Sequence, residues 1–449
     1  LGPSYLKEKN TNTNYKSFQA TVDYSKTFNN VHNIGILAGY SWEEESARDL
    51  EGRRDNLPSN EYPYLTVGSP DNQTNAGGGY DWVIQSFFGR AQYNYAERYL
   101  GEVTMRYDGS SRFPSSSRYA FFPSAAIGWR ISEESFFKEN EKLSFINNLK
   151  LKASAGILGN NNIGNYAYQS VYELGNDFNY PLGGTIQQGA ALKTYTDPRL
   201  KWETTRTINA GIDFSFLNNR LSGNIDFYVA NTSDLLMKRT VPIMNGYNSI
   251  MDNVGKTRNT GVEIVLNSVN VETKDFRWGS TFNFALNRDK IIELRGDGND
   301  DLTNKWFIGE PVRVHYDYDV IGTWQENDQF VINGHTISWD TTQKKYLNED
   351  GVEYQKGAAP GSAKLADRDG DGVITAKDKK IIGSKLPSFT MSLGNTINYK
   401  DFTFSFLFNG VFGVTKEMQD YNFERWGLGY NYIDGMDYWT PENPTNEMT

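Results

Sequence analysis

Hydrophobic and polar residues alternate along residues 220–232, and the rest of the chain repeats this pattern. Successive side chains of a β-strand point to opposite faces, so every second residue shares a side. One side is hydrophobic and consists of Leu221, Gly223, Ile225, Phe227 and Val229. The other side is mostly polar and consists of Ser222, Asn224, Asp226, Tyr228 and Ala230. A polar turn at 218–219 joins this stretch to an alternating stretch at 206–216, which predicts a β-hairpin.

Similar alternating stretches predict twelve strands in all. They are expected near 15–28, 31–42, 82–95, 99–108, 119–131, 149–157, 206–216, 220–232, 253–266, 278–286, 389–399 and 402–409. Polar segments separate them, and Gly77, Gly78 and Gly79 are interpreted as part of a flexible loop. The longest insert is expected at 288–386.

The connections alternate between short and long, which favours an outer-membrane barrel. Such barrels have tight turns at the periplasmic rim and long loops outside. The connection at 132–148 is the exception, and it is expected to contain one helical turn. The alternative is a soluble β-sandwich or a stack of hairpin modules. That alternative is disfavoured because the aromatic face of residues 402–408 would aggregate if it were exposed to water.

Composition narrows the class of protein further. The 449 residues have a mean hydropathy of −0.62 and no long apolar run, which excludes a transmembrane helix. The net charge of −10 without a basic cluster argues against binding to nucleic acid. The absence of cysteine excludes disulfides and thiolate sites. The sequence opens in mid-pattern at Leu1 and ends at 447–449 just after a loop-like segment, so the chain is expected to be a fragment.

Seven motifs follow one another in a characteristic order. They are RYDGSSRF at 106–113, FPSAAIGW at 122–129, LKASAGILGN at 151–160, WETT at 202–205, NTGVEI at 259–264, DRDGDGVITAKDKKIIGS at 367–384 and YWTPENPTN at 438–446. Together they make the whole chain, 1–449, resemble the barrel of SusC/RagA-type TonB-dependent outer-membrane transporters of Bacteroidetes.

This resemblance implies a transmembrane antiparallel β-barrel of about 22 strands, of which this chain supplies about twelve. It also implies an N-terminal plug, a segment that contacts TonB, and a SusD-like lipoprotein that caps the pore. The implied function is import of a glycan or peptide through the lipid of a Gram-negative outer membrane. No plug, TonB box or closing strand is recognisable here. The alternatives are a passive porin, an outer-membrane adhesin and an outer-membrane enzyme.

Residues 367–378 match the spacing of an EF-hand loop. The expected ligands are Asp367, Asp369, Asp371, the Val373 carbonyl, Thr375 and Asp378. Oxygen ligands at these positions suit Ca²⁺, and a glycine at the sixth position allows the sharp turn. Asp378 is shorter than the usual glutamate, which favours weak Ca²⁺ binding or Mg²⁺. The alternative is an Asp- and Gly-rich turn that holds no ion.

Tryptophans in the loops are candidate substrate contacts, because aromatic faces suit sugar rings and peptide side chains. The candidates are Trp202, Trp306, Trp324 and Trp426. The competing interpretation is packing within the loops and a place in the aromatic belt at the membrane surface. On the strands, Glu102, Arg106, Asp226 and Asn283 are expected to face the lumen, mostly as hydrated wall. The chain has three histidines and no HExxH, G-x-S-x-G or P-loop motif, so no enzyme is predicted.

Overall fold

The computed structural model describes the chain except residues 1–3, 60, 175–177, 195, 241–243, 245–248, 327, 418–436, 438 and 446–449. The chain divides into two compact units. Unit 1 comprises Leu1–Asn299 and Met391–Asn409, and unit 2 comprises Asp300–Thr390 and Gly410–Thr449. No helix in the described part is long and apolar enough to cross a membrane.

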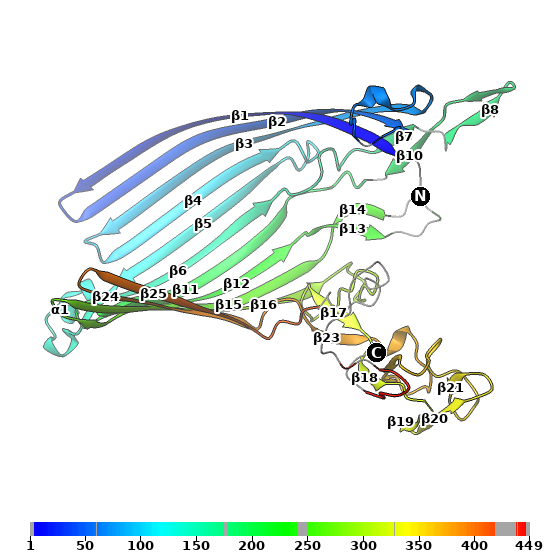
Figure 1. Cartoon of the computed structure of the whole chain (residues 1–449). Coiled ribbons are helices and arrows are strands. Elements are labelled where there is room, and N and C mark those ends of the chain that lie inside the picture. Colours follow the sequence, from blue (N-terminus) through cyan, green and yellow to red (C-terminus); the bar gives the residue numbers. More distant parts are fainter. Residues whose placement is uncertain are drawn as a thin grey trace. The chain divides into compact units, whose positions relative to one another are not determined.

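A twelve-stranded antiparallel sheet forms unit 1, and each strand lies beside the next of these strands along the chain (Figure 1). The strands are β1 (Tyr5–Phe28), β2 (His32–Asp55), β3 (Gln73–Tyr95), β4 (Tyr99–Ser110), β5 (Tyr119–Arg130), β6 (Ile146–Asn160), β11 (Glu203–Phe216), β12 (Leu221–Ser233), β15 (Lys256–Glu272), β16 (Phe276–Glu293), β24 (Phe389–Tyr399) and β25 (Phe402–Phe412). These twelve strands confirm the predicted number and order.

The register places hydrophobic residues beside one another on one face of this sheet. Ile225 of β12 lies opposite Ile212 of β11 and Ile264 of β15. Ile264 in turn lies opposite Phe284 of β16. Phe227, two residues beyond Ile225, is 53% exposed. The hydrophobic side of the alternating pattern is therefore a continuous apolar face that the described residues do not cover with a core of their own.

Tight turns connect most strands at one end of the sheet. Asn218 and Asn219 adopt positive φ angles of 54° and 64°, and Arg220 N–H donates to the Leu217 carbonyl at 3.2 Å. Asparagine tolerates this left-handed conformation better than most residues, which explains its use in the turn. The predicted turn between β11 and β12 is confirmed.

The longer connection between β5 and β6 contains the predicted helical turn. It consists of η3 (Ile131–Glu133), α1 (Ser135–Lys138) and η4 (Glu141–Leu143). The Glu134 carboxylate accepts hydrogen bonds from the Tyr99 hydroxyl at 2.6 Å and from Trp129 Nε1 at 3.0 Å. These bonds to the charged form lower the pKa of Glu134. The connection is thereby tied to the ends of β4 and β5.

The first three strands are much longer than predicted. They contain 24, 24 and 23 residues, about twice the length needed to cross a membrane. Their extended parts are polar on both faces, so alternation does not reveal them. Cross-strand ion pairs join these parts, with Lys7 Nζ 2.8 Å from Glu51 Oε1 and Lys9 Nζ 3.3 Å from Asp49 Oδ2.

The interpretation of Gly77, Gly78 and Gly79 as a flexible loop is wrong. These glycines lie in β3, where Gly77 pairs with Leu50 and Gly79 pairs with Arg48. A Cβ atom at Gly79 would lie 2.8 Å from the Ala47 carbonyl oxygen of β2, which favours glycine there. The turn before β3 contains η1 (Leu65–Val67) and η2 (Pro70–Asn72).

Three small ribbons occupy the long connections of unit 1. They pair β7 (Val171–Leu174) with β10 (Ala190–Thr194), β8 (Tyr180–Leu182) with β9 (Thr185–Gln187), and β13 (Leu236–Thr240) with β14 (Ser249–Asn253). A hydrophobic cluster packs against Leu236 of β13 and Met251 of β14, and it consists of Phe113, Phe122, Ile163, Leu200 and Trp202.

Unit 2 is built from short strands around its own aromatic core. Its pairs are β17 (Val314–Asp317) with β23 (Lys380–Ser384) and β18 (Val320–Thr323) with β22 (Ala363–Leu365). A third sheet contains β19 (Gln329–Ile332), β20 (His335–Asp340) and β21 (Lys345–Leu347). The core consists of Trp324, Ile337, Tyr346, Tyr354 and Ala358. The insert begins after Glu293, where β16 ends, rather than at the predicted residue 288.

Candidate functional site

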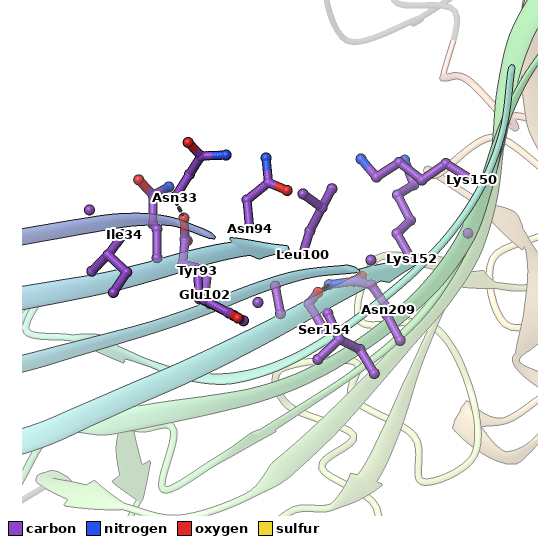
Figure 2. A pocket seen from close by; sticks show the side chains of 18 of the residues that line it. Asn33, Ile34, Tyr93, Asn94, Leu100, Glu102, Lys150, Lys152, Ser154 and Asn209 are labelled. Atoms are coloured by element: carbon purple, nitrogen blue, oxygen red, sulfur yellow. Dashed lines mark hydrogen bonds between the residues drawn. The ribbon is translucent and has the colours of Figure 1, made fainter. Parts of the chain in front are cut away.

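A hollow of about 740 Å³ lies along strands β1 to β6, β11 and β12 of unit 1. Figure 2 shows Lys150, Lys152 and Asn94 projecting from one face of the sheet into this hollow. Asp226 and Asn209 also line it. The side of the sheet that carries these polar side chains therefore lines an open hollow rather than a packed core.

An ionic cluster connects three strands in this wall. Lys152 Nζ on β6 lies 2.8 Å from Asp213 Oδ1 on β11 and 2.9 Å from Asp226 Oδ1 on β12. Lys150 Nζ lies 3.3 Å from the other Asp213 oxygen. Asn224 Nδ2 donates to Asp226 at 2.6 Å. The lysine ammonium groups and aspartate carboxylates thus compensate one another across the face of the sheet.

Gly211 of β11 leaves the space that this cluster needs. A Cβ atom there would lie 2.1 Å from Asp226 Oδ1 and 2.7 Å from Lys152 Cε. We expect Gly211→Ala to displace the ion pair and to lower the free energy of unfolding by about 1–3 kcal/mol. Urea unfolding of the full-length protein in lipid vesicles measures this effect. Gly101→Ala is the matched control, because a Cβ at Gly101 has nothing within 4 Å; equal stability of the two variants would contradict the expectation.

The other residues predicted to face the lumen contact polar side chains on their own strand or on an adjacent strand. Glu102 accepts a hydrogen bond from Gln92 at 2.6 Å. Arg106 lies 3.1 Å from Asp108, and Asn283 Nδ2 donates to Ser392 Oγ at 3.0 Å. These contacts agree with their interpretation as wall residues. The sequence reasoning did not single out Lys152 and Asp213, which the register of three strands brings together.

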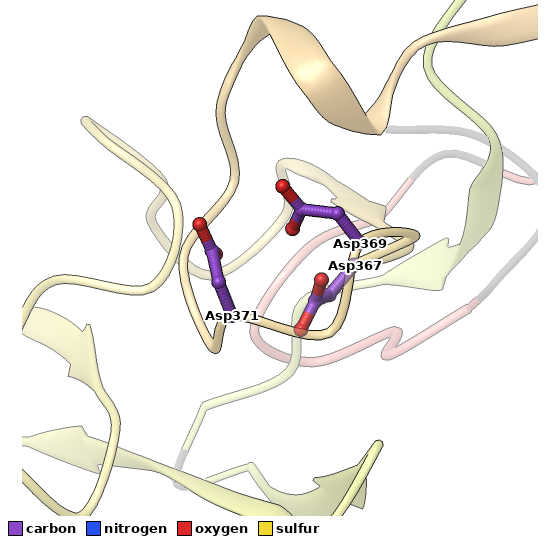
Figure 3. A group of neighbouring side chains, drawn as sticks. All are labelled: Asp367, Asp369 and Asp371. Carbon is purple, nitrogen blue, oxygen red and sulfur yellow. The ribbon is translucent and has the colours of Figure 1, made fainter.

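Three carboxylates of the EF-hand-like loop gather in unit 2 (Figure 3). Ligand atoms of Asp367, Asp369 and Asp371 lie within 4.8 Å of one another. Asp367 is only 3% exposed, and its two oxygens accept backbone N–H groups of Gly370 at 2.7 Å and Gly372 at 3.0 Å. Both glycines have positive φ angles, which fold the loop around the first carboxylate.

The last part of the loop begins η7 (Ala376–Asp378). Thr375 caps this turn by accepting the Lys377 N–H at 3.2 Å. The buried Asp378 carboxylate accepts the N–H groups of Arg368 at 2.7 Å and Thr375 at 2.6 Å. Val373 N–H donates to Asp371 Oδ1 at 3.0 Å. The structure therefore gathers the first three predicted acids, while Asp378 holds the two ends of the loop together.

His335 supports the apex of this loop. Its Nε2 lies 3.2 Å from the Gly370 carbonyl oxygen, and its Nδ1 lies 2.7 Å from Glu349 Oε1. The hydrogen bond to Glu349 raises the pKa of His335. A Cβ at Gly372 would meet the imidazole ring at 3.0 Å, so the ring packs directly on the loop.

Two of the candidate tryptophans lie in the hydrophobic cores of the loops. Trp202 is 7% exposed, and its Nε1 donates to the Arg118 carbonyl at 3.0 Å. Trp324 is fully buried, with its ring 3.7 Å from that of Tyr346. Their burial favours the packing interpretation over substrate contact. Trp306 is half-buried, and Trp426 lies outside the described residues.

The amino-acid sequence matches a known family and several named proteins. Residues 2–448 match the family described as "TonB dependent receptor-like, beta-barrel". The chain is 32% identical over 454 residues to TonB-dependent receptor P26 of Formosa agariphila, covering 98% of this chain and 43% of that receptor. It is 34% identical over 327 residues to TonB-dependent receptor SusC of Bacteroides thetaiotaomicron, covering 72% of this chain and 30% of SusC.

The structure also resembles that of the RagAB peptide importer in its "closed-closed" state. The TM-score is 0.73 at 26% sequence identity, with 91% of this chain and 42% of that chain covered. The chain spans less than half the length of each of these relatives. The matching family, the twelve-stranded sheet and its apolar face agree, and this chain belongs to the TonB-dependent receptor-like β-barrel family of outer-membrane proteins.

Proposed function

We propose that the full-length protein imports a nutrient, either a glycan or a peptide, across the outer membrane in a TonB-dependent manner. The chain contributes barrel wall and extracellular mouth. The observation that supports this most is the two-sided sheet, which is apolar where Ile225 and Ile264 align and polar where Lys152, Asp213 and Asp226 meet. Such a sheet suits lipid on one face and a hydrated passage on the other.

The long connections supply the mouth in this proposal. Barrels of this kind keep short turns on the periplasmic side, so the insert after β16 lies outside the cell. A SusD-like lipoprotein docks there as a lid, and TonB acts through a region of the full-length protein. The names of the relatives support these partners, since one is SusC and another is a RagAB importer. The family is one of receptors, and we propose no catalytic role for this chain.

Uptake measurements on cells test this function. Deleting the gene for the full-length protein is expected to abolish uptake of a labelled oligosaccharide or peptide nutrient, and so is deleting TonB. Complementation with the intact gene is the control. Uptake that depends on the gene but persists without TonB would instead identify a passive porin.

We further propose that the loop at 367–378 binds a divalent cation, Ca²⁺ or Mg²⁺, and thereby stiffens the insert. Asp367, Asp369 and Asp371 supply carboxylate oxygens, and Val373, Thr375 and Asp378 remain the further predicted ligands. Carboxylates that already lie within 4.8 Å of one another repel, and a cation relieves that repulsion.

Calcium titration of the full-length protein tests this site. We expect binding with a dissociation constant of about 10⁻⁴–10⁻³ M, the range of weak extracellular sites. Asp367→Ala is expected to weaken binding at least about tenfold, because it removes the buried first carboxylate. Asp350→Ala, outside the loop, is the control. The site is refuted if calorimetry detects uptake of neither Ca²⁺ nor Mg²⁺ by the unaltered protein.

A further inference from the structure

Three basic residues lie side by side on the sheet, near the ends of β11, β12, β15 and β16 that lead into the long connections. These four strands are neighbours in the sheet (Figure 1). Arg206 of β11 lies opposite Asn231 of β12, which lies opposite Arg258 of β15. Arg258 in turn lies opposite Lys290 of β16. Arg206, Arg258 and Lys290 are called the basic row below.

The basic row belongs to the apolar face of the sheet. Asn231 lies six positions after Ile225 on β12, and an even separation places two strand residues on the same face. Arg258 Nε donates to Asn231 Oδ1 at 2.7 Å, so these two side chains meet there. Six residues of a strand tilted by about 40° rise about 15 Å, whereas half of the apolar band of a barrel is about 12 Å. With Ile225 at the middle of the hydrophobic stripe, the basic row lies at the level of the lipid headgroups.

No carboxylate compensates the basic row in the described part of the chain. Arg206, Arg258 and Lys290 are exposed, and none of them forms an ion pair with a described residue. Glu293, at the end of β16, is paired with Lys256 at 2.6 Å. Other acidic residues of the four strands lie on the lumen side, and they include Glu203, Asp213, Asp226, Glu263 and Asp289. The outer side therefore presents three positive charges to whatever lies beside it.

An apolar hollow of about 440 Å³ lies directly below the basic row on the same face. Ile208 and Thr260 line it, and each lies two positions from an arginine of the row on its own strand. Ile208 is 63% exposed, so the hollow is open to the outside of the sheet. The hollow continues toward the middle of the apolar face along Phe227, Val229, Val262 and Leu286. A hydrocarbon chain thus finds an apolar groove that ends beneath the positive charges.

The width of the basic row limits which headgroup fits. Three steps between neighbouring strands separate Arg206 from Lys290, which corresponds to about 14 Å. A single phosphate group cannot contact both ends of such a row. A disaccharide with one phosphate at each end spans it, and Arg258 then lies between the two phosphates.

We propose that the basic row and the apolar hollow bind a glycolipid of the outer leaflet whose disaccharide headgroup carries two phosphates. An acyl chain lies in the hollow, and the phosphate oxygens accept hydrogen bonds from the basic row. Arginine suits this role because its planar fork binds phosphate through two parallel hydrogen bonds. This inference goes beyond import. It uses from the proposed function only the orientation that places the long connections outside the cell.

Lipid binding to the purified full-length protein in detergent tests the site. The probe is bisphosphorylated lipid A, and native mass spectrometry measures the bound fraction. A variant that combines Arg206→Gln, Arg258→Gln and Lys290→Gln is expected to bind about a hundredfold more weakly, because each basic residue near an anionic lipid contributes roughly fivefold. Combining Arg206→Lys and Arg258→Lys keeps all three charges and is expected to weaken binding by less than about tenfold. Heat-dependent gel mobility confirms that each variant is folded.

The matched control removes a charge from the other face of the sheet. Arg90 of β3 shares its face with Gln92, which lines the hollow of about 740 Å³. Arg90→Gln is expected to bind lipid A as the unaltered protein does. Equal binding by the unaltered protein and the triple glutamine variant would overturn the inference, and so would an equal loss in Arg90→Gln.

Changes to the lipid give a second readout that leaves the protein intact. Lipid A without its phosphates is expected to bind the unaltered protein at least about tenfold more weakly, and to bind the glutamine variant as lipid A does. Inorganic phosphate at the concentration of the lipid is expected not to displace it. Equal binding of the two lipids would show that the apolar face alone holds the lipid, and displacement by inorganic phosphate would identify a site for a free anion. Either result overturns the inference.

Discussion

Ile225→Arg is expected to prevent most of the full-length protein from inserting into the outer membrane. Ile225 lies at the centre of the hydrophobic stripe of β12, between Ile212 and Ile264. A charged side chain near the middle of the lipid face of a barrel costs about 2–4 kcal/mol. The measurement is the amount of heat-modifiable, folded protein in the outer-membrane fraction.

The neighbouring residue provides the matched control for this substitution. Asn224 precedes Ile225 on the same strand but lies on the polar face, where it donates to Asp226. Asn224→Arg adds the same charge to the hydrated side and is expected to leave insertion close to that of the unaltered protein. If both variants inserted equally well, the assignment of the two faces would be wrong.

Trp324→Ala is expected to unfold the insert while the barrel remains intact. Trp324 is fully buried, stacks on Tyr346 and donates its Nε1 to Gln355 at 3.2 Å. Lys364 Nζ lies 4.8 Å from the centre of the Trp324 ring. Removing a buried tryptophan costs about 3–5 kcal/mol, which is comparable to the whole stability of a small unit.

Limited proteolysis of the full-length protein measures this effect. Cleavage within residues 300–390 should become rapid in Trp324→Ala, while the heat-dependent gel mobility of the barrel stays unchanged. Val331→Ala is the control, because Val331 lies in the same unit but is 68% exposed. Unchanged resistance of the insert in Trp324→Ala would show that this aromatic core does not hold unit 2 together.

The sequence predicts the strands wherever the two faces of the sheet meet different surroundings. Lipid on one side and water on the other force residues such as Ile225 and Asp226 to alternate, so periodicity detects these strands. The extended parts of β1, β2 and β3 are polar on both faces, and the pattern vanishes there. Gly77, Gly78 and Gly79 then suggest a loop, because local propensity does not register the pairing with β2.

The candidate sites differ in how far local sequence specifies them. The three acids at 367, 369 and 371 are separated by one residue each, so their proximity follows from spacing alone. Lys152 and Asp226 are 74 positions apart, and their contact requires the registers of β6, β11 and β12. The turn at Asn218 sets the register of β11 and β12, but β6 and β11 are joined by a long connection that sets no register.

The burial of the tryptophans depends on distant segments. Trp202 packs against Phe113 and Phe122, which come from a loop and a strand far earlier in the chain. No periodicity in the sequence indicates that these segments meet. The breaks in the alternating pattern place these tryptophans in loops. They do not indicate whether a ring faces a substrate or a core.

Cysteine scanning along β12 tests most directly whether this sheet is the wall of an outer-membrane barrel. This chain contains no cysteine, so single cysteines can be introduced from Leu221 to Val229 in the full-length protein in membranes, with cysteines elsewhere removed. Positions 222, 224, 226 and 228 should react with a water-soluble maleimide. Fluorophores at 225, 227 and 229 should be quenched by nitroxide-labelled lipid. Uniform labelling, or the opposite alternation, would contradict the assignment of the apolar face to lipid and the polar face to the lumen.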